Sequence, residues 1–149
     1  TTRDLRWKRV DIKSLNLLAP VLAKQYAYEQ KAQEAWLVDD DGFITEGSSS
    51  NAWILIGNTV YTRPVSSSIL NGITRKTLMK GLGKYGYKFK EKKFNLKDIK
   101  KSKEAYITSA TQYVMPVTKI DNQKIGNGRV GKFAKHFKDI YLESVQLSD

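Results

Sequence analysis

Hydrophobic and polar positions along the chain repeat with two different periods, which predict both strands and helices. Charged and apolar residues alternate from Arg6 to Val10, as in a short strand. From Asn16 to about Lys31 the apolar residues follow the i, i+3, i+4 spacing of an amphipathic helix. The side chains expected to face inward on this helix are Leu17, Leu18, Val21, Leu22 and Tyr26. Lys13 is therefore expected at a junction between a strand and a helix.

Four strands are expected after this helix, over 34–39, 43–46, 52–56 and 59–62. Asp41-Gly42 is a strong hairpin signal between the first two strands, and Gly57-Asn58 predicts a tight turn between the last two. We expect three consecutive antiparallel strands to form a meander.

The second half of the chain continues the mixture of helices and strands. A loop over 63–71 contains Pro64 and three serines, and Gly72-Ile73-Thr74 then opens a helix that Gly86 closes. Leu78 and Leu82 are expected to face inward on it. The remaining expected elements are a lysine-rich edge strand over 87–94, a short helix over 96–101 capped by Asn95, strands over 104–108 and 114–120, a turn-rich loop over 122–129, and an amphipathic helix over 130–145 with Phe133, Phe137, Ile140 and Tyr141 on one face.

Antiparallel strands mixed with helices predict an α/β (mixed α+β) fold, neither a doubly wound parallel sheet nor an all-β sandwich. The 149 residues contain no internal repeat and no low-complexity linker, so we expect one domain with a sizeable core. No apolar run approaches the length of a membrane span, and no signal peptide is visible.

Composition excludes several kinds of chemistry. The chain has no cysteine, which excludes disulfides, thiol catalysis and cysteine-ligated metals and is compatible with a reducing compartment. The single histidine, His136, cannot build a histidine-rich metal site and is expected to be exposed.

The net charge of +11 is concentrated in one stretch. Eleven lysines lie between Lys76 and Lys103, with only Glu91 and Asp98 as acidic residues. A nucleic-acid-binding surface would use such a stripe for phosphate contacts. The stripe has no arginine after Arg75, however, and arginine is the residue suited to bidentate base readout. We favour a solvated lysine face and keep nucleic-acid binding as a remote alternative.

Four features carry candidate chemistry. Lys13 is flanked by Ile12 and Leu15, and partial desolvation would lower its pKa from about 10.4 and free its amine for imine formation. The alternative is that Lys13 is an ordinary surface lysine. Glu46 ends an apolar strand and precedes a run of small residues, so its carboxylate has either a buried cationic partner or an exposed position.

The other two features are sources of backbone amides and hydroxyl groups. Gly72-Ile73-Thr74 starts a helix after a loop, and such helix N-termini receive phosphate groups. The turn Thr108-Ser109-Ala110-Thr111 is a second source. Each feature alone is also found in plain caps and turns, but together the four describe a cofactor with a carbonyl, a ring nitrogen and a phosphate.

Five motifs occur in a characteristic order and spacing. They are Asp-Ile-Lys-Ser-Leu-Asn at 11–16, Val-Asp-Asp-Asp-Gly at 38–42 followed by Thr-Glu-Gly-Ser-Ser-Ser-Asn at 45–51, Ile-Leu-Asn-Gly-Ile-Thr-Arg at 69–75, Thr-Ser-Ala-Thr at 108–111 and Pro-Val at 116–117. With them the chain resembles the fold-type IV pyridoxal-phosphate enzymes, the family of the branched-chain and D-amino acid aminotransferases. The resemblance runs from about Arg6 to the final helix.

The resemblance implies a mixed, barrel-like sheet with flanking helices and a site for pyridoxal 5'-phosphate. Lys13 would bind the cofactor covalently and shuttle a proton, and Glu46 would pair with the pyridine nitrogen. Ile73 and Thr74 would bind the phosphate, and Leu70 would pack near the ring.

Other positions are implied less directly. Ser109 and Thr111 would help to close the phosphate and ring side of the site. Ser49, Ser50 and Arg6 are weaker candidates near the cofactor. Two departures from the family pattern are Ala110, where a phosphate-binding Thr is frequent, and Tyr113, where a Glu is frequent.

Small differences indicate a branch of the family. Branched-chain enzymes typically carry Asn-Tyr after the lysine and Glu-Gly-x-Gly-Glu-Asn around the glutamate. This chain has Asn16-Leu17 and the run 46–51, which is similar to the D-amino acid aminotransferases. The implied reaction is ping-pong transfer of an amino group from a D-amino acid, such as D-alanine, to a 2-oxo acid. The alternatives on the same fold are an aminodeoxychorismate lyase and a branched-chain aminotransferase.

The resemblance also implies a domain organisation. Family members carry a smaller N-terminal domain before the segment present here, so residues 1–149 are expected to be the lysine-bearing, cofactor-binding C-terminal domain with the N-terminal small domain absent. We expect this domain alone to bind the cofactor weakly and turn over poorly. A cytoplasmic homodimer is implied as well.

Overall fold

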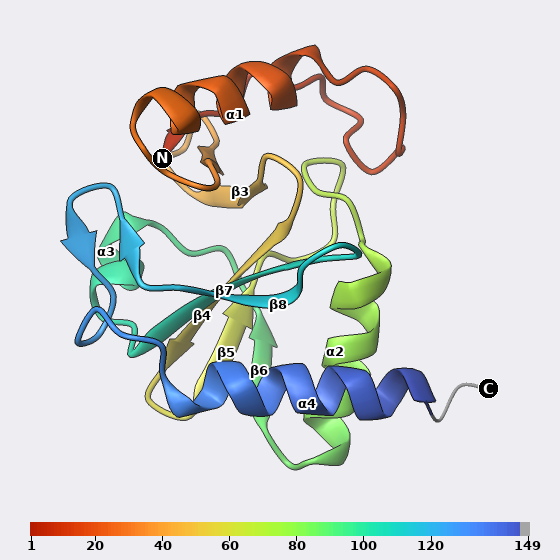
Figure 1. Ribbon diagram of the computed structural model, residues 1–149. Coiled ribbons are helices and arrows are strands. Elements are labelled where there is room, and N and C mark those ends of the chain that lie inside the picture. The colour runs from red at the N-terminus through yellow and green to blue at the C-terminus, as the bar shows by residue number, and fades with distance from the viewer. Residues whose placement is uncertain (147–149) are drawn as a thin grey trace.

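The computed structural model describes residues 1–146 (Figure 1). The elements in chain order are β1 (Thr2–Arg3), α1 (Leu18–Glu29), β2 (Trp36–Val38), β3 (Ile44–Gly47), β4 (Asn51–Ile56), β5 (Thr59–Thr62), α2 (Ile73–Lys84), β6 (Lys88–Glu91), α3 (Leu96–Lys100), β7 (Glu104–Ser109), β8 (Tyr113–Val117), β9 (Lys119–Ile120), β10 (Gln123–Lys124) and α4 (Lys132–Gln146).

A five-stranded sheet in the order β6-β5-β4-β7-β8 forms the centre of the molecule. Within this sheet only the β5–β6 pair is parallel, and α2 makes the crossover between these two strands. A second sheet has the order β1-β2-β3, and β9 and β10 form a short ribbon. The mixed α+β class is confirmed, although the large sheet is open, with β6 and β8 as its edges, and does not close into a barrel.

Alternating residues of the central strands supply two cores, since successive side chains of a strand point to opposite faces. Trp53 and Leu55 of β4 face α2 and α4. Ala52 and Ile54 face the opposite side, where β2, β3 and α3 contribute the buried residues. Figure 1 shows α1 lying on the small sheet, at the other end of the molecule from α4.

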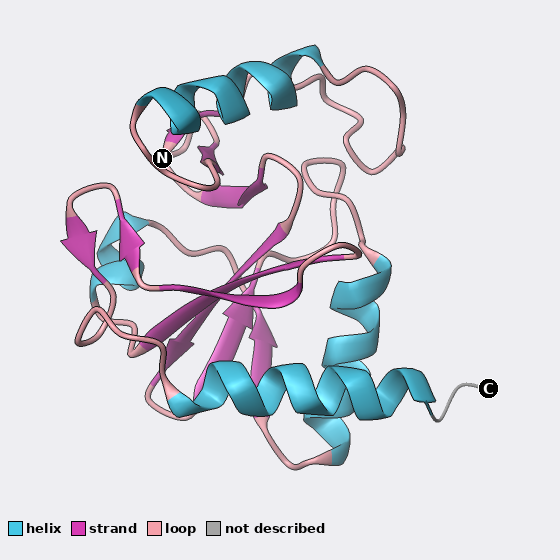
Figure 2. Cartoon of the chain, in the orientation of Figure 1, coloured by secondary structure: helices cyan, strands magenta, loops and turns pink. Residues whose placement is uncertain are grey.

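The prediction of a strand from Arg6 to Val10 is wrong. Figure 2 shows this stretch as part of a long loop between β1 and α1. The strand lies earlier instead, where Thr2 pairs in parallel register with Leu37. The later residues bond to another loop rather than to a strand, because the N–H of Val10 donates to the carbonyl of Ser67 at 2.9 Å.

The helix expected after Asn16 forms, but the predicted buried face is wrong. The large apolar residues are exposed: Leu17, Leu18, Val21, Leu22 and Tyr26. The buried residues of α1 are Ala23 and Ala27, which pack with Leu37 of β2, in the small sheet, and with Ala35 just before that strand. Small side chains allow α1 to approach this sheet closely, so its larger residues remain on the outer side.

The prediction of a three-stranded meander is also wrong, because β3 and β4 belong to different sheets. The two hairpins on either side of that break are confirmed. β2 and β3 are joined through Gly42 at a φ of 82°, and β4 and β5 through Gly57 at 61°. Between the hairpins the N–H of Gly47 donates to the carbonyl of Ser50 at 2.7 Å, which makes the turn that moves the chain from one sheet to the other.

The second half follows the sequence pattern closely. Leu78 and Leu82 of α2 are buried, and Asn95 caps α3 in a capping box with Asp98. β6 is an exposed edge strand. The expected strand over 114–120 is divided into β8 and β9, and the loop over 122–129 contains β10.

The final helix also agrees with the prediction. Phe137, Ile140 and Tyr141 of α4 are buried, Phe133 packs against them, and His136 is exposed. Within residues 1–146, no helix is long and apolar enough to cross a membrane.

Candidate active site

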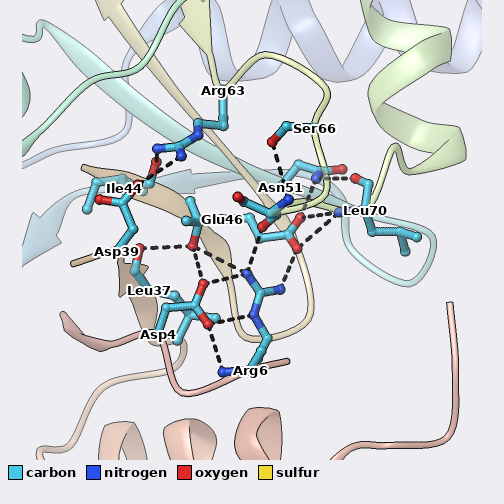
Figure 3. A network of polar contacts seen from close by, with 12 residues as sticks. Asp4, Arg6, Leu37, Asp39, Ile44, Glu46, Asn51, Arg63, Ser66 and Leu70 are labelled. Carbon is cyan, nitrogen blue, oxygen red and sulfur yellow. Dashed lines mark hydrogen bonds and ion pairs between the residues drawn. The ribbon is translucent and has the colours of Figure 1, made fainter. Parts of the chain in front are cut away.

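The side chain of Glu46 is buried at the end of β3, with 4% of the residue exposed. Its Oε1 accepts a hydrogen bond and ion pair from Arg6 Nη1 at 2.5 Å. The sequence left open whether Glu46 has a buried cationic partner or an exposed position, and the buried partner is the one observed. Figure 3 shows Glu46 between Arg6 on one side and Asn51 and Leu70 on the other.

Arg6 is held in place by a second carboxylate. Asp4 accepts bonds from Arg6 Nε at 2.9 Å and from Nη2 at 2.8 Å, a bidentate pairing that fixes the guanidinium plane. The hydroxyl of Thr45 donates to Asp4 at 2.8 Å, and the carbonyl of Ser68 accepts from Arg6 at 3.1 Å. Arg6 therefore joins the loop before α1 to β3 and to the loop over 63–72.

Two further donors reach the Glu46 carboxylate. The Nδ2 of Asn51 donates to Oε2 at 2.7 Å, and the N–H of Leu70 lies 3.2 and 3.3 Å from the two oxygens. A carboxylate offers about four acceptor positions. Arg6, Asn51 and Leu70 therefore fix the carboxylate, with both of its oxygens accepting hydrogen bonds.

Burial and charge act in opposite directions on the ionisation of this network. Burial raises the pKa of Glu46 to about 7, although the charge and hydrogen bond of Arg6 oppose the rise. For Asp4, burial also works to raise the pKa, but the bonds and charge of Arg6 outweigh it and lower the pKa below its ordinary value. Glu46 can therefore exchange a proton with a neighbouring group near neutral pH.

The N-terminus of α2 provides a second set of polar groups. Gly72 occupies the N-cap position without a side-chain cap, and the first-turn amides of a helix have no intrahelical acceptor. Thr74 is buried, and its Oγ1 has no hydrogen-bond partner among residues 1–146. An unpartnered buried hydroxyl beside free amides is the donor set that phosphate oxygens accept.

The turn between β7 and β8 lies at the same end of the large sheet. Asn51 pairs with Thr108 across β4 and β7, so Ser109 follows directly beside the start of β4. The hydroxyls of Ser109 and Thr111 are 3.4 Å apart, and Ser109 Oγ accepts from the N–H of Gln112. The two departures from the family pattern are in or beside this turn: Ala110 is exposed, and the Tyr113 ring lies against Tyr141 of α4.

Lys13 lies in the loop before α1 and is exposed, so the partial desolvation expected from the sequence is not observed. Its amine makes no hydrogen bond or ion pair with any residue of 1–146 that would bring it to Glu46 or Thr74. The structure therefore assembles Glu46, Leu70 and the start of α2 into one site and leaves Lys13 outside that hydrogen-bonded network.

Ser49 and Ser50, the weaker candidates, are bonded to a different carboxylate. The hydroxyls of Ser48, Ser49 and Ser50 all donate to Glu34, and Lys24 donates to Ser49 at 3.1 Å. These bonds brace the turn between β3 and β4. A rigid turn fixes the end of β3, and with it the direction of the Glu46 side chain.

Two residues of the network were not identified from the sequence. Asn51 is the only polar residue of β4, which is otherwise apolar, and that position was a signal that could have found it. Asp4 has no such signal, since an acidic residue near the start of the chain is unremarkable. Among residues 1–146, no group of histidine, aspartate and glutamate side chains could hold a metal ion.

Solved structures show the same fold. The T.th. branched-chain amino acid aminotransferase, complexed with N-(5'-phosphopyridoxyl)-L-glutamate, superimposes with a TM-score of 0.86 at 28% identity, over 95% of this chain and 50% of that one. The holo-form of a branched-chain amino acid aminotransferase from Thermobaculum terrenum gives a TM-score of 0.88 at 22% identity, over 99% and 51% of the two chains.

Sequence relatives are more similar in identity. The D-alanine aminotransferase of Bacillus licheniformis is 43% identical over 145 residues, 97% of this chain and 51% of that protein. The D-alanine aminotransferase of Staphylococcus epidermidis is 42% identical over 146 residues, 98% and 51% of the two chains. The chain thus spans about half the length of these curated relatives. The model of the amino-transferase class IV family matches residues 1–120, and the chain belongs to that family.

Proposed function

We propose that this chain is the cofactor-binding part of a pyridoxal-phosphate-dependent aminotransferase that moves an amino group from a D-amino acid, such as D-alanine, to a 2-oxo acid. The observation that carries the proposal is the presence of two sets of polar groups, here called half-sites: the Glu46 carboxylate and the N-terminus of α2. A buried carboxylate held by Arg6 and Asn51 lies at one end, and an unpartnered buried hydroxyl at a helix N-terminus lies at the other. The D-alanine aminotransferase relatives support the choice of substrate.

Pyridoxal 5'-phosphate fits the chemistry of these residues. When bound, this cofactor supplies a carbonyl that takes up an amino group and a protonated ring that withdraws electrons. Glu46 holds the proton on the ring nitrogen, and its raised pKa suits that exchange. The amide of Ile73 and the hydroxyl of Thr74 bind the phosphate.

The remaining assignments complete the site. Leu70 holds Glu46 through its N–H and borders the ring, while Ser109 and Thr111 close the phosphate side. Lys13 would supply the amine that condenses with the cofactor carbonyl, whose oxygen leaves as water, and would move the proton at the substrate α-carbon. Its amine is exposed and makes no hydrogen bond or ion pair among residues 1–146, so no such contact has to be broken for this role.

The proposal includes the assembly of the protein. We assign residues 1–149 to the lysine-bearing C-terminal domain, with the N-terminal small domain supplied by the rest of a longer enzyme. Self-association into a homodimer belongs to the same proposal, and the exposed apolar residues of α1 support it. The cytoplasmic location expected from the sequence remains a proposal too.

A branched-chain aminotransferase is the second candidate, favoured by the similarity to solved branched-chain enzymes. Their identity to this chain is 28% or lower, against 40% to 43% for the D-alanine aminotransferases. The D-amino acid is therefore the better-supported donor.

Borohydride trapping tests the cofactor assignment. The chain is incubated with pyridoxal phosphate, reduced, digested and mapped by mass spectrometry. We expect the label on Lys13, with loss in Lys13→Ala and no change in Lys8→Ala, a matched exposed lysine of the same loop. Label spread equally over surface lysines, and unchanged in Lys13→Ala, would contradict the assignment.

Product analysis tests the substrate. Pyruvate formed from D-alanine and 2-oxoglutarate identifies the D-amino acid reaction, whereas turnover of L-leucine identifies the branched-chain one. Turnover by this chain at the rate of an intact enzyme would contradict the assignment of a missing domain.

A further inference from the structure

The side chain of Asn51 connects the two half-sites of the proposed cofactor site. Both hydrogens of an asparagine amide can be donated, and in Asn51 they go to different partners. Nδ2 donates to Glu46 Oε2 at 2.7 Å and to the carbonyl of Leu70 at 2.8 Å. One buried nitrogen thus ties the carboxylate at the end of β3 to the loop that leads into α2 (Figure 3).

The other atom of the same amide faces the start of α2. A Cβ placed on Gly72 would lie 2.7 Å from Asn51 Oδ1, closer than two such atoms can approach. Gly72 therefore lets the N-cap of α2 lie directly against Asn51. The helix N-terminus and the Glu46 carboxylate are both located relative to this one side chain.

Asn51 differs from the other two donors to Glu46 in where its backbone lies. Arg6 and Leu70 belong to loops. Asn51 begins β4, the central strand of the large sheet, and is paired there with Thr108 of β7. Of the three donors, it is the one anchored directly in the sheet, so its position serves as the reference for the rest of the site.

We infer that Asn51 is a positioning residue that sets the distance between the Glu46 carboxylate and the N-terminus of α2, and thereby the spacing at which the ring nitrogen and the phosphate of pyridoxal phosphate are held together. This inference rests on the proposed function. A ligand held at both ends depends on that spacing, whereas a ligand held at one end does not.

The test compares ligands that use one end or both. Asn51→Leu has a similar volume, carries no charge and cannot donate to Glu46 or accept near Gly72. We expect the dissociation constant of pyridoxal phosphate to rise about tenfold or more, a loss of about 1.4 kcal/mol. We expect the dissociation constant of inorganic phosphate to change less than about twofold, because it uses only the α2 end.

Ring-nitrogen protonation gives a second readout that a purely structural role would not move. With ¹⁵N-labelled pyridoxal phosphate, the ring nitrogen resonance should lie at the protonated position in the unaltered chain and shift toward the unprotonated position in Asn51→Leu. Asn58→Leu, at an exposed turn position, is the matched control and should behave like the unaltered chain.

Asn51→Ser provides a smaller, polar replacement whose hydroxyl is too short to span both partners, and it should show the same pattern if Asn51→Leu does not fold. Unchanged cofactor affinity and an unchanged ¹⁵N shift in a folded Asn51 variant would overturn the inference and leave the proposed function standing. Equal losses for phosphate and pyridoxal phosphate would also overturn it. An unaltered chain that binds no pyridoxal phosphate would overturn the proposed function and this inference together.

Discussion

Glu46 is a buried acid whose ionisation is coupled to the stability of the cofactor-free fold. Its pKa is about 7 when folded and 4.5 in an unperturbed carboxyl, so the folded state binds the proton more tightly. Its contribution to the free energy of unfolding is fully present below pH 4.5 and is lost as the pH rises through 7. For a pKa difference of about 2.5 units, the loss is on the order of 3 kcal/mol.

Glu46→Gln removes this titration, so we expect the unfolding free energy of the variant to change less between about pH 5 and pH 8 than that of the unaltered chain. Urea denaturation at the two pH values measures the difference. Asp4 does not interfere, because its lowered pKa makes its own contribution disappear only as the pH falls below 3.8. Glu29→Gln, on the exposed side of α1, is the control. The same pH dependence in both variants would contradict the assignment.

Thr74 is a buried residue whose hydroxyl has no hydrogen-bond partner among residues 1–146, and under the proposed function it binds the cofactor phosphate. A buried hydroxyl without a partner costs stability, so Thr74→Val should leave the cofactor-free unfolding free energy unchanged or raise it by up to about 1 kcal/mol. The affinity for pyridoxal phosphate should fall about tenfold, since a bond to a charged group is worth about 1.5 kcal/mol or more. Thermal unfolding and equilibrium titration measure the two effects, and Thr74→Ser should restore binding. A valine variant that is clearly less stable would show that the hydroxyl has a structural partner.

The site residues differ in how far the sequence could predict them. Glu46 and Thr74 were singled out as candidates because each follows a local rule: a carboxylate at the end of an apolar strand, and a hydroxyl at a helix start. Asn51 and Asp4 were not singled out, because each joins a neighbour in sequence to a distant segment: Asn51 joins Glu46 to Leu70, and Asp4 joins Arg6 to Thr45. Asp4 and Glu46 meet only through Arg6, and no local pattern encodes that contact.

At the scale of elements, the helices also differ in how well the sequence predicts their packing. α2 and α4 were predicted well because their apolar stripes face a large sheet that can bury them. The stripe of α1 was equally clear in the sequence, yet it faces outward and the alanines face inward. A periodic pattern predicts a helix, but it cannot show which surface is near enough to cover the stripe.

Two glycines of α2 allow a matched test of helix packing. A Cβ on Gly81 would lie 2.4 Å from Cγ2 of Ile140 on α4, whereas the nearest atom to a Cβ on Gly83 is 3.9 Å away on Phe89. We expect Gly83→Ala to stabilise the chain by about 0.5–1 kcal/mol, through helix propensity. Gly81→Ala should instead destabilise it by about 1–3 kcal/mol, because the two helices must move apart. Thermal unfolding measures both, and equal effects would contradict the close packing of α2 on α4.

At the scale of the whole molecule, the lysine-rich stretch and the α1 surface are expected to have opposite effects on association with other chains. All four residues of β6, including Lys88 and Lys90, are exposed at a sheet edge, where charged side chains prevent pairing with other chains. That role accounts for the lysine alternation in β6 without a nucleic-acid partner. The first turns of α1 instead expose Leu18, Val21 and Leu22, an apolar surface that charge repulsion does not protect.

Self-association through this apolar face is the prediction that involves the whole molecule. Leu18, Val21 and Leu22 are more than half exposed on adjacent turns of α1, a contiguous surface of the kind that marks interaction sites. A second copy can cover it, because two such faces are both apolar and need no complementary charge. Burial of an apolar anchor at an interface centre contributes about 2 kcal/mol, so Leu22→Glu should weaken dimerisation by more than about tenfold. Sedimentation velocity over a range of concentrations measures this, and Val130→Glu, an exposed apolar residue in a loop before α4, is the matched control. A chain that sediments as a monomer throughout, or a Leu22→Glu variant that still dimerises, would exclude this face as the interface.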